Sequence, residues 1–191
     1  MSSLLAQLED LVAPERLRPL RRVEYEQMVG EGLFHDERIE LLKGVIVALG
    51  PQGPPHAATV QRLTSRLVIA LAGKGEVRIQ LPLAVGDDSL PEPDVAVVAP
   101  GDHDQAHPTT AFLIVEVSDT SLNKDRLVKA ELYAIAAVPE YWIANISAGV
   151  IEAHTDPVAG RYTRVTPYRP GDSVRLRAFP DVDLRVADIL H

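Results

Sequence analysis

The chain contains no cysteine among its 191 residues, and this absence excludes a disulfide framework and thiolate chemistry. Three common catalytic motifs are missing as well: a Gly-rich phosphate loop, a Gly-x-Ser-x-Gly nucleophile turn and a His-Glu-x-x-His zinc motif. A functional site must therefore be sought among other residue types and other spacings.

Long hydrophobic runs are also absent. Outside one central strand, the longest apolar run covers residues 67–72, far short of the ~18 residues that cross a bilayer. The N-terminus, MSSLLAQLEDLV, carries acidic residues and no basic cluster, so it does not resemble a signal peptide. With 46% hydrophobic and 24% charged residues, the sequence predicts a cytoplasmic globular protein without membrane contact.

Positive charge is scarce, and the net charge of −8 argues against a general nucleic-acid binder. The charges are unevenly distributed, however. Residues 84–104 hold six acids and no Lys or Arg, whereas residues 158–177 hold five arginines and one acid. The first segment could bind a cation and the second could face phosphates. Two solvated surfaces explain the pattern equally well.

The hydrophobic periodicity predicts a mixed α/β sheet flanked by helices. Helices are expected at 2–12, 23–30, 56–72 and 123–137, and strands at 38–49 (a hairpin turning at 43–44), 76–81, 94–98, 111–117, 140–146 and 150–154. The remaining residues indicate further strands and a loose C-terminal end. No repeat or linker divides the chain, so we expect one domain over 1–191, with a helical extension at 1–20.

Two acids are expected to meet in the sheet. Glu116 stands near the end of an apolar strand, where an unpartnered carboxylate would cost several kcal/mol, so a metal, lysine or arginine should contact it. Asp94 begins a neighbouring strand, and a short connection favours antiparallel pairing, which would bring Asp94 beside Glu116. Two converging carboxylates favour Mg²⁺ or a similar ion. The alternative is that Asp94 caps a turn and Glu116 pairs with an arginine.

A lysine on the following helix could complete this site. Asp125, Lys129 and Tyr133 lie four residues apart and share one helical stripe. A surface ion pair between Asp125 and Lys129 would also explain this spacing. The chain uses 15 Arg and only four Lys, however, so a lysine at this position is a less routine choice. Glu40 is a second acid in an apolar strand, and His56 opens a helix, where a packed neutral imidazole is the simpler explanation.

These residues lie within motifs that resemble the Uma-two family, bacterial proteins with a restriction-endonuclease-like fold. The matching stretches are 93–98, 115–122, 125–126, 129, 132–134 and 139–143, together with 39–44, His56 and 168–171, so the resemblance covers roughly residues 20–190. The sequence departs from the family at Ser118, where the usual lysine is missing, at Leu127, often Gly, and at Ala144–Asn145, where Val-Asp is expected.

The resemblance implies a PD-(D/E)xK nuclease core in a single restriction-endonuclease-like domain. In that core Asp94 and Glu116 would bind Mg²⁺ or Mn²⁺, Lys129 would supply the missing lysine from the helix, and Glu40 and His56 would line the same pocket. Nucleic acid would be the substrate, and a homodimer is plausible. The core is also compatible with a catalytically inactive binding or regulatory module, because fold does not settle function.

Overall fold

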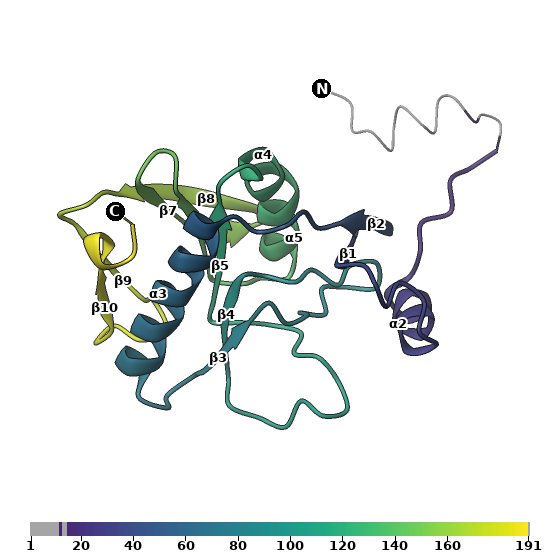
Figure 1. Ribbon diagram of the computed structural model, residues 1–191, viewed down its shortest axis with the longest axis horizontal. Helices are drawn as coiled ribbons and strands as arrows, with labels where there is room; N and C mark the ends of the chain where they lie inside the picture. The colour runs from purple at the N-terminus through teal and green to yellow at the C-terminus, as the bar shows by residue number, and fades with distance from the viewer. Residues whose placement is uncertain (1–11, 13–14, 191) are drawn as a thin grey trace.

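The centre of the structure is a six-stranded mixed sheet (Figure 1). The computed structural model describes residues 12 and 15–190. In spatial order the strands are β3 (Glu76–Ile79), β4 (Val95–Val98), β5 (Leu113–Ser118), β6 (Glu140–Asn145), β7 (Val150–Val158) and β8 (Arg161–Tyr168). β5 and β6 run parallel, and every other neighbouring pair in this sheet is antiparallel. The predicted mixed α/β fold is confirmed.

The parallel pair requires a crossover, and a continuous helical segment provides it. This segment consists of α4 (Leu122–Lys124), a π-helical turn, η1 (Asp125–Lys129), and α5 (Ala130–Ile135). Every residue of β4, β5 and β6 is buried, as expected for apolar strands that are covered on both faces. An acid within β5 is therefore almost entirely shielded from water.

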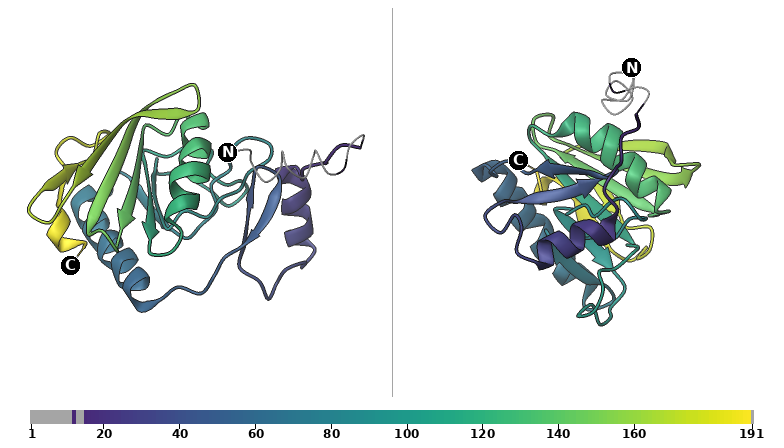
Figure 2. Two further views of the ribbon diagram at one scale, coloured as in Figure 1. Left: turned by 90° about the horizontal axis from the view of Figure 1, so that it is seen from above. Right: turned by 90° about the vertical axis from the view of Figure 1, so that its right-hand side faces the viewer.

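The two faces of the sheet pack against different helices (Figure 2). Side chains alternate along β5, so Val115 and Val117 pack with α3 (Pro54–Leu71), whereas Ile114 packs with Tyr133 of α5. Glu116 has the same parity as Ile114 and therefore points to the α5 face. Because of this alternation, a side-chain partner for Glu116 must come from the helical segment on the α5 face.

A helix and a hairpin form a smaller layer beside the sheet. These are α2 (Arg22–Gly30), β1 (Ile39–Leu42) and β2 (Val45–Ala48). Leu41 of β1 and Leu90 exchange backbone hydrogen bonds. The hairpin turns at Lys43 and Gly44, whose φ angles of 50° and 75° match a two-residue turn. A Cβ on Gly44 would clash with the Cβ of Pro19, so the turn also requires glycine for space.

The predicted helices and strands appear within a few residues of their expected ends. α3 starts at Pro54, two residues before the predicted start, because proline is tolerated in the first helical turn. The predicted helix at 2–12 lies outside the described residues except for Val12, and residues 15–20 of the expected helical extension are not helical. No helix in the described part of the chain is long and apolar enough to span a bilayer.

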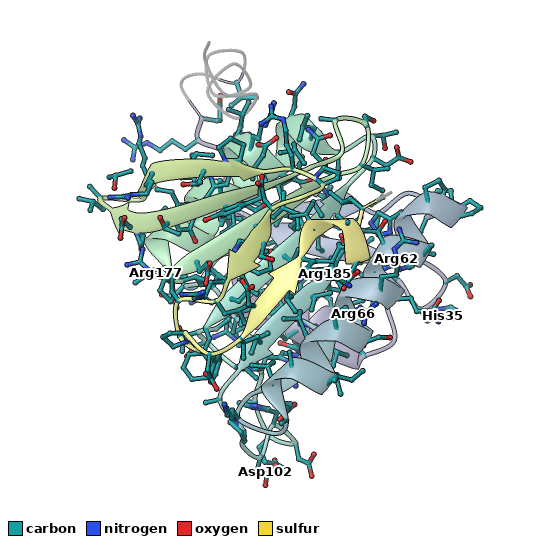
Figure 3. All side chains as sticks on the ribbon, turned by 90° about the vertical axis from the view of Figure 1, so that its left-hand side faces the viewer. His35, Arg62, Arg66, Asp102, Arg177 and Arg185 are labelled. Carbon is teal, nitrogen blue, oxygen red and sulfur yellow. The ribbon has the colours of Figure 1, made fainter. Side chains whose placement is uncertain are left out.

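The expectation of a loose C-terminal end is wrong. After β9 (Ser173–Arg175) the chain forms β10 (Asp183–Arg185) and a 3-10 turn, η2 (Val186–Asp188), which lie against α3 on the side of the molecule seen in Figure 3. Buried apolar side chains anchor the segment: Val174, Leu176, Val182, Leu184, Val186, Ile189 and Leu190. Arg62 of α3 also donates a 2.7 Å hydrogen bond from Nε to the Ile189 carbonyl. The segment thus closes the core on the α3 face.

Replacing Ile189 by alanine should lower the free energy of unfolding by about 2–5 kcal/mol, because a fully buried side chain leaves a cavity in the core. The matched control is Ile69→Ala on α3, where the side chain is 74% exposed and the change should stay within about 0.5 kcal/mol. Urea denaturation of both variants measures the difference. Equal effects would show that the C-terminal segment does not contribute to the core.

Candidate functional site

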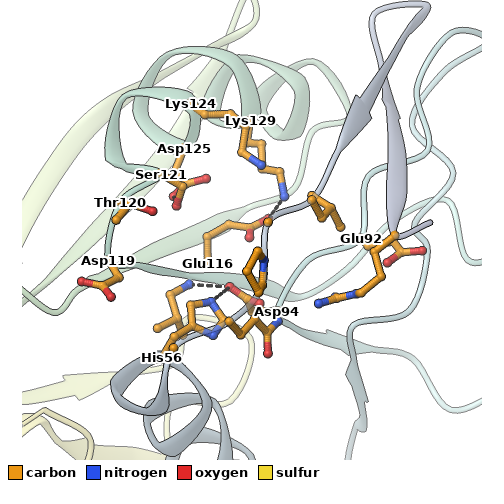
Figure 4. Close-up of a pocket in the computed structure, with 17 residues that line it drawn as sticks. His56, Glu92, Asp94, Glu116, Asp119, Thr120, Ser121, Lys124, Asp125 and Lys129 are labelled. Carbon is orange, nitrogen blue, oxygen red and sulfur yellow. Dashed lines mark hydrogen bonds and ion pairs between the residues drawn. The ribbon is translucent and has the colours of Figure 1, made fainter. Parts of the chain in front are cut away.

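Two acids meet where β4 begins and β5 ends. Val95 pairs with Val115 in antiparallel register, so Asp94, which immediately precedes β4, lies opposite Glu116. The backbone N–H of Val117 donates a 2.8 Å hydrogen bond to Asp94 Oδ2. Both acids line the same cavity, which Figure 4 shows in close-up. The predicted antiparallel pairing is confirmed, although Asp94 stands just outside the strand.

The buried carboxylate of Glu116 has a lysine as its cationic partner. Lys129 Nζ lies 2.8 Å from Glu116 Oε1, and the hydroxyl of Tyr133 donates to the same oxygen at 2.7 Å. Burial raises the pKa of Glu116, and the nearby charge of Asp94 adds to this, although Lys129 opposes it. Burial alone would lower the pKa of Lys129, but two carboxylates outweigh it and raise that pKa, so the ammonium stays charged.

The second carboxylate that contacts Lys129 belongs to Glu40 of β1, which is fully buried. Its Oε2 lies 3.0 Å from Lys129 Nζ and accepts the backbone N–H of Glu92 at 3.2 Å. Its Oε1 accepts a 2.9 Å hydrogen bond from Lys124 Nζ. Burial would raise the pKa of Glu40, but the two ammonium groups outweigh burial and lower it. Glu40 is thus an ionised carboxylate that gathers two lysines beside Glu116.

His56 contacts the other acid of the pair. Its Nε2 lies 3.1 Å from Asp94 Oδ2, so α3 reaches the site from the face opposite α5. The hydrogen bond to Asp94 is the main cause that raises the pKa of His56, and burial opposes it. Burial would raise the pKa of Asp94, but His56, the backbone N–H of Val117 and the charge of Lys129 together outweigh burial and lower it. His56 is therefore part of the pocket rather than a packed helix start.

The π-helical turn explains how one short helix supplies two lysines. The N–H of Ala130 donates to the carbonyl of Asp125, five residues earlier, instead of four. In a regular α-helix Lys124 and Lys129 would point about 140° apart, at 3.6 residues per turn. In this structure both contact Glu40. Sequence periodicity indicated Lys129 and Tyr133 and missed Lys124, because an α-helical stripe does not include residues five apart.

The cavity in front of these groups has a volume of about 220 Å³ and is rich in charge. The acidic side chains that line it outnumber the lysines and arginines: Glu92, Asp94, Glu116, Asp119 and Asp125 face Arg38, Lys124 and Lys129. Thr120 and Ser121, from the loop after β5, also line it. Of the acidic segment at 84–104, two members therefore reach the cavity, Glu92 and Asp94.

The basic segment at 158–177 does not belong to this cavity. None of its five arginines is among the residues that line it. Arg161 and Arg164 lie on β8, the far edge strand of the sheet, and Arg177 pairs with Asp156 at 2.6 Å. All five are exposed: Arg161, Arg164, Arg169, Arg175 and Arg177. The solvated-surface explanation fits these arginines better than a phosphate-facing wall of this site.

The donor set fits a hard divalent cation with few protein ligands. Both hydrogen bonds that Glu116 accepts fall on Oε1, which leaves Oε2 with spare acceptor capacity among the described residues. No cluster of three or more His, Cys, Asp or Glu side chains suited to an ion occurs within residues 12 and 15–190. Mg²⁺ commonly uses one or two carboxylates and keeps several waters, so the pair of Asp94 and Glu116 suits it.

Comparisons with known proteins agree with this architecture. A family model described as "Uma2: Putative restriction endonuclease" matches residues 22–187. Among solved structures, the chain is similar to a protein from Anabaena variabilis ATCC 29413 that is described as a putative nuclease belonging to DUF820. The TM-score is 0.63 at 16% identity, covering 81% of this chain and 90% of the other. At that identity the likeness shows the fold alone. No curated protein matches the chain.

The Lys129→Met variant should lose roughly 3–5 kcal/mol of unfolding free energy, because it leaves two buried carboxylates without their shared cation. The control is Lys74→Met, which removes an exposed pair with Asp181 and should leave the unfolding free energy nearly unchanged. Urea denaturation at neutral pH compares them. If both variants are equally stable, the Lys129 ion pairs do not hold the site together.

Proposed function

This chain belongs to the Uma2 family, and we propose that it is a nuclease that uses Mg²⁺ or Mn²⁺ to hydrolyse phosphodiester bonds in nucleic acid. The observation that carries the proposal is the meeting of Asp94 and Glu116 in one cavity, with Lys129 Nζ 2.8 Å from Glu116. The descriptions of the family and of the Anabaena variabilis protein both refer to nucleases and support the same activity.

Asp94 and Glu116 are the residues that would hold the divalent ion. The chemistry such an ion supplies in phosphodiester hydrolysis is activation of a water molecule and neutralisation of the charge that develops on the phosphate. His56 fixes the carboxylate of Asp94 through its 3.1 Å contact. Tyr133 and Lys129 fix Glu116 in the same way, at 2.7 and 2.8 Å. Both carboxylates are thus oriented before any ligand binds.

Lys129 has a second part in this proposal. It lies at the position where, by the family resemblance, the helix supplies the lysine, since Ser118 occupies the usual place. Its buried ammonium places a positive charge beside Glu116, where it favours the anionic transition state of phosphoryl transfer. Glu40 keeps that ammonium in position at 3.0 Å. The homodimer and the cytoplasmic location expected from the sequence stay predictions and do not enter the proposal.

Cleavage of DNA and RNA in the presence of Mn²⁺ tests the proposed activity. The Asp94→Asn variant should be at least about 100-fold slower, since even changes to groups that only support metal ligands cost 10- to 100-fold. Asp102→Asn, in an exposed loop, is the matched control and should cleave at the wild-type rate. Chelation by EDTA should stop cleavage. Equal residual cleavage by the wild type and Asp94→Asn would point to a contaminant and contradict the proposal.

Metal binding can be measured separately from turnover. In a thermal-shift titration, Mn²⁺ at about 100 times its dissociation constant should stabilise the wild-type fold by about 2.7 kcal/mol. Glu116→Gln should abolish the shift, because it removes one of two carboxylate ligands, whereas the exposed Glu37→Gln should retain it. An unshifted wild type that also fails to cleave nucleic acid would favour the alternative, a catalytically inactive binding or regulatory module.

A further inference from the structure

We propose that Lys124, and not Lys129, is the side chain that binds a phosphate group of the nucleic acid in this cavity. The inference rests on the proposed nuclease function and deepens it by assigning different tasks to the two lysines. Lys129 holds Glu116 and Glu40 in place and contributes its positive charge from within these ion pairs, whereas Lys124 makes the hydrogen-bonding contact with the substrate. No motif in the sequence indicates Lys124, since it lies outside the stripe that contains Lys129 and Tyr133.

The two ammonium groups differ first in access. The side chain of Lys129 is 3% exposed, and two carboxylates of buried residues, Glu40 and Glu116, hold its Nζ at 3.0 and 2.8 Å. The side chain of Lys124 is 29% exposed and lines the cavity. A phosphate that enters the cavity can therefore reach Lys124 without breaking a buried ion pair. Lys129 offers at most one further donor, on a side chain that is almost fully enclosed.

The two groups differ also in unused donors. An ammonium has three N–H donors, and the contact with Glu40 Oε1 at 2.9 Å occupies one of those on Lys124. The other two remain for phosphate oxygens, and a flexible lysine is well suited to serve as such a point charge. Glu40 is itself held by Lys129 and by the backbone N–H of Glu92. The carboxylate therefore acts as a fixed support from which Lys124 extends into the cavity.

The excess of acidic side chains in the cavity explains why an accessible lysine is needed there. Acids outnumber lysines and arginines along its walls, so a phosphodiester that enters meets repulsion unless an accessible cation faces it. Figure 4 shows Lys124 and Lys129 on the same helical segment above Glu116. The π-helical turn between them brings both lysines to Glu40, one enclosed and one partly open.

Salt-dependent binding is the direct test, with Ca²⁺ in place of Mn²⁺ and fluorescence anisotropy of a labelled DNA duplex and of RNA with the same sequence. Lys124→Gln should reduce the slope of log affinity against log salt by about 0.9 for duplex DNA, which corresponds to one lost phosphate contact. Lys124→Arg keeps the charge and should keep the slope. Lys74→Gln removes an exposed lysine that does not line the cavity, so this variant should bind with the same salt dependence as the wild type.

The cleavage assay with Mn²⁺ adds an independent readout, in which Lys124→Gln should raise KM and leave kcat nearly unchanged. If the wild type binds nucleic acid and Lys124→Gln retains its full salt slope, the inference is wrong and the nuclease proposal stands. If the wild type binds neither DNA nor RNA and cleaves neither, both are overturned. A reduced slope in Lys124→Gln with a wild-type slope in Lys124→Arg supports the assignment even where cleavage is slow.

Discussion

The ion pairs of Lys129 with Glu40 and Glu116 are the interaction on which the site depends. The three charged groups come from different parts of the fold: the β1 hairpin, the central strand β5 and the crossover helix. Removing charges from water is costly, and mutual contact with good geometry has to offset that cost. A single buried ammonium therefore ties the small hairpin layer to the main sheet.

If the proposed function holds, stability and metal binding depend on the same side chains at this site. The groups that stabilise Glu116 in a buried position, Lys129 and Tyr133, also fix the direction of its carboxylate. His56 does the same for Asp94 from the opposite face of the sheet. Substitutions at the supporting residues are thus expected to affect folding and ligand binding together, whereas the partly exposed Lys124 can change binding with less effect on folding.

The mixed topology explains why the site lies where it does. β4 and β5 are antiparallel, so the start of one strand lies beside the end of the other, and Asp94 meets Glu116. β5 and β6 are parallel, so the chain must leave that same end of β5 and return through a helix. The crossover therefore begins at the two acids, and its first turns carry Lys124 and Lys129 past them.

Much of the site could be read from local patterns. An acid near the end of an apolar strand indicated a cationic partner, which could be a metal, a lysine or an arginine. A short connection between strands favoured antiparallel pairing, so the meeting of Asp94 and Glu116 was predictable. That Glu40 and His56 line the same pocket was implied by the family resemblance alone, because strand alternation leaves the direction of Glu40 open. That direction depends on the packing of the hairpin, which brings Glu40 to both lysines.

From the sequence alone, the order of the main elements, the meeting of the two acids and the need for a cationic partner could be inferred, because each follows from burial and spacing within one or two neighbouring segments. Which cation that partner is, Lys129, came from the structure. The tertiary structure alone decided the π-helical turn, the inclusion of Lys124 and the burial of the C-terminal segment. These depend on contacts between segments far apart in the chain, and no local periodicity records which of those contacts will form.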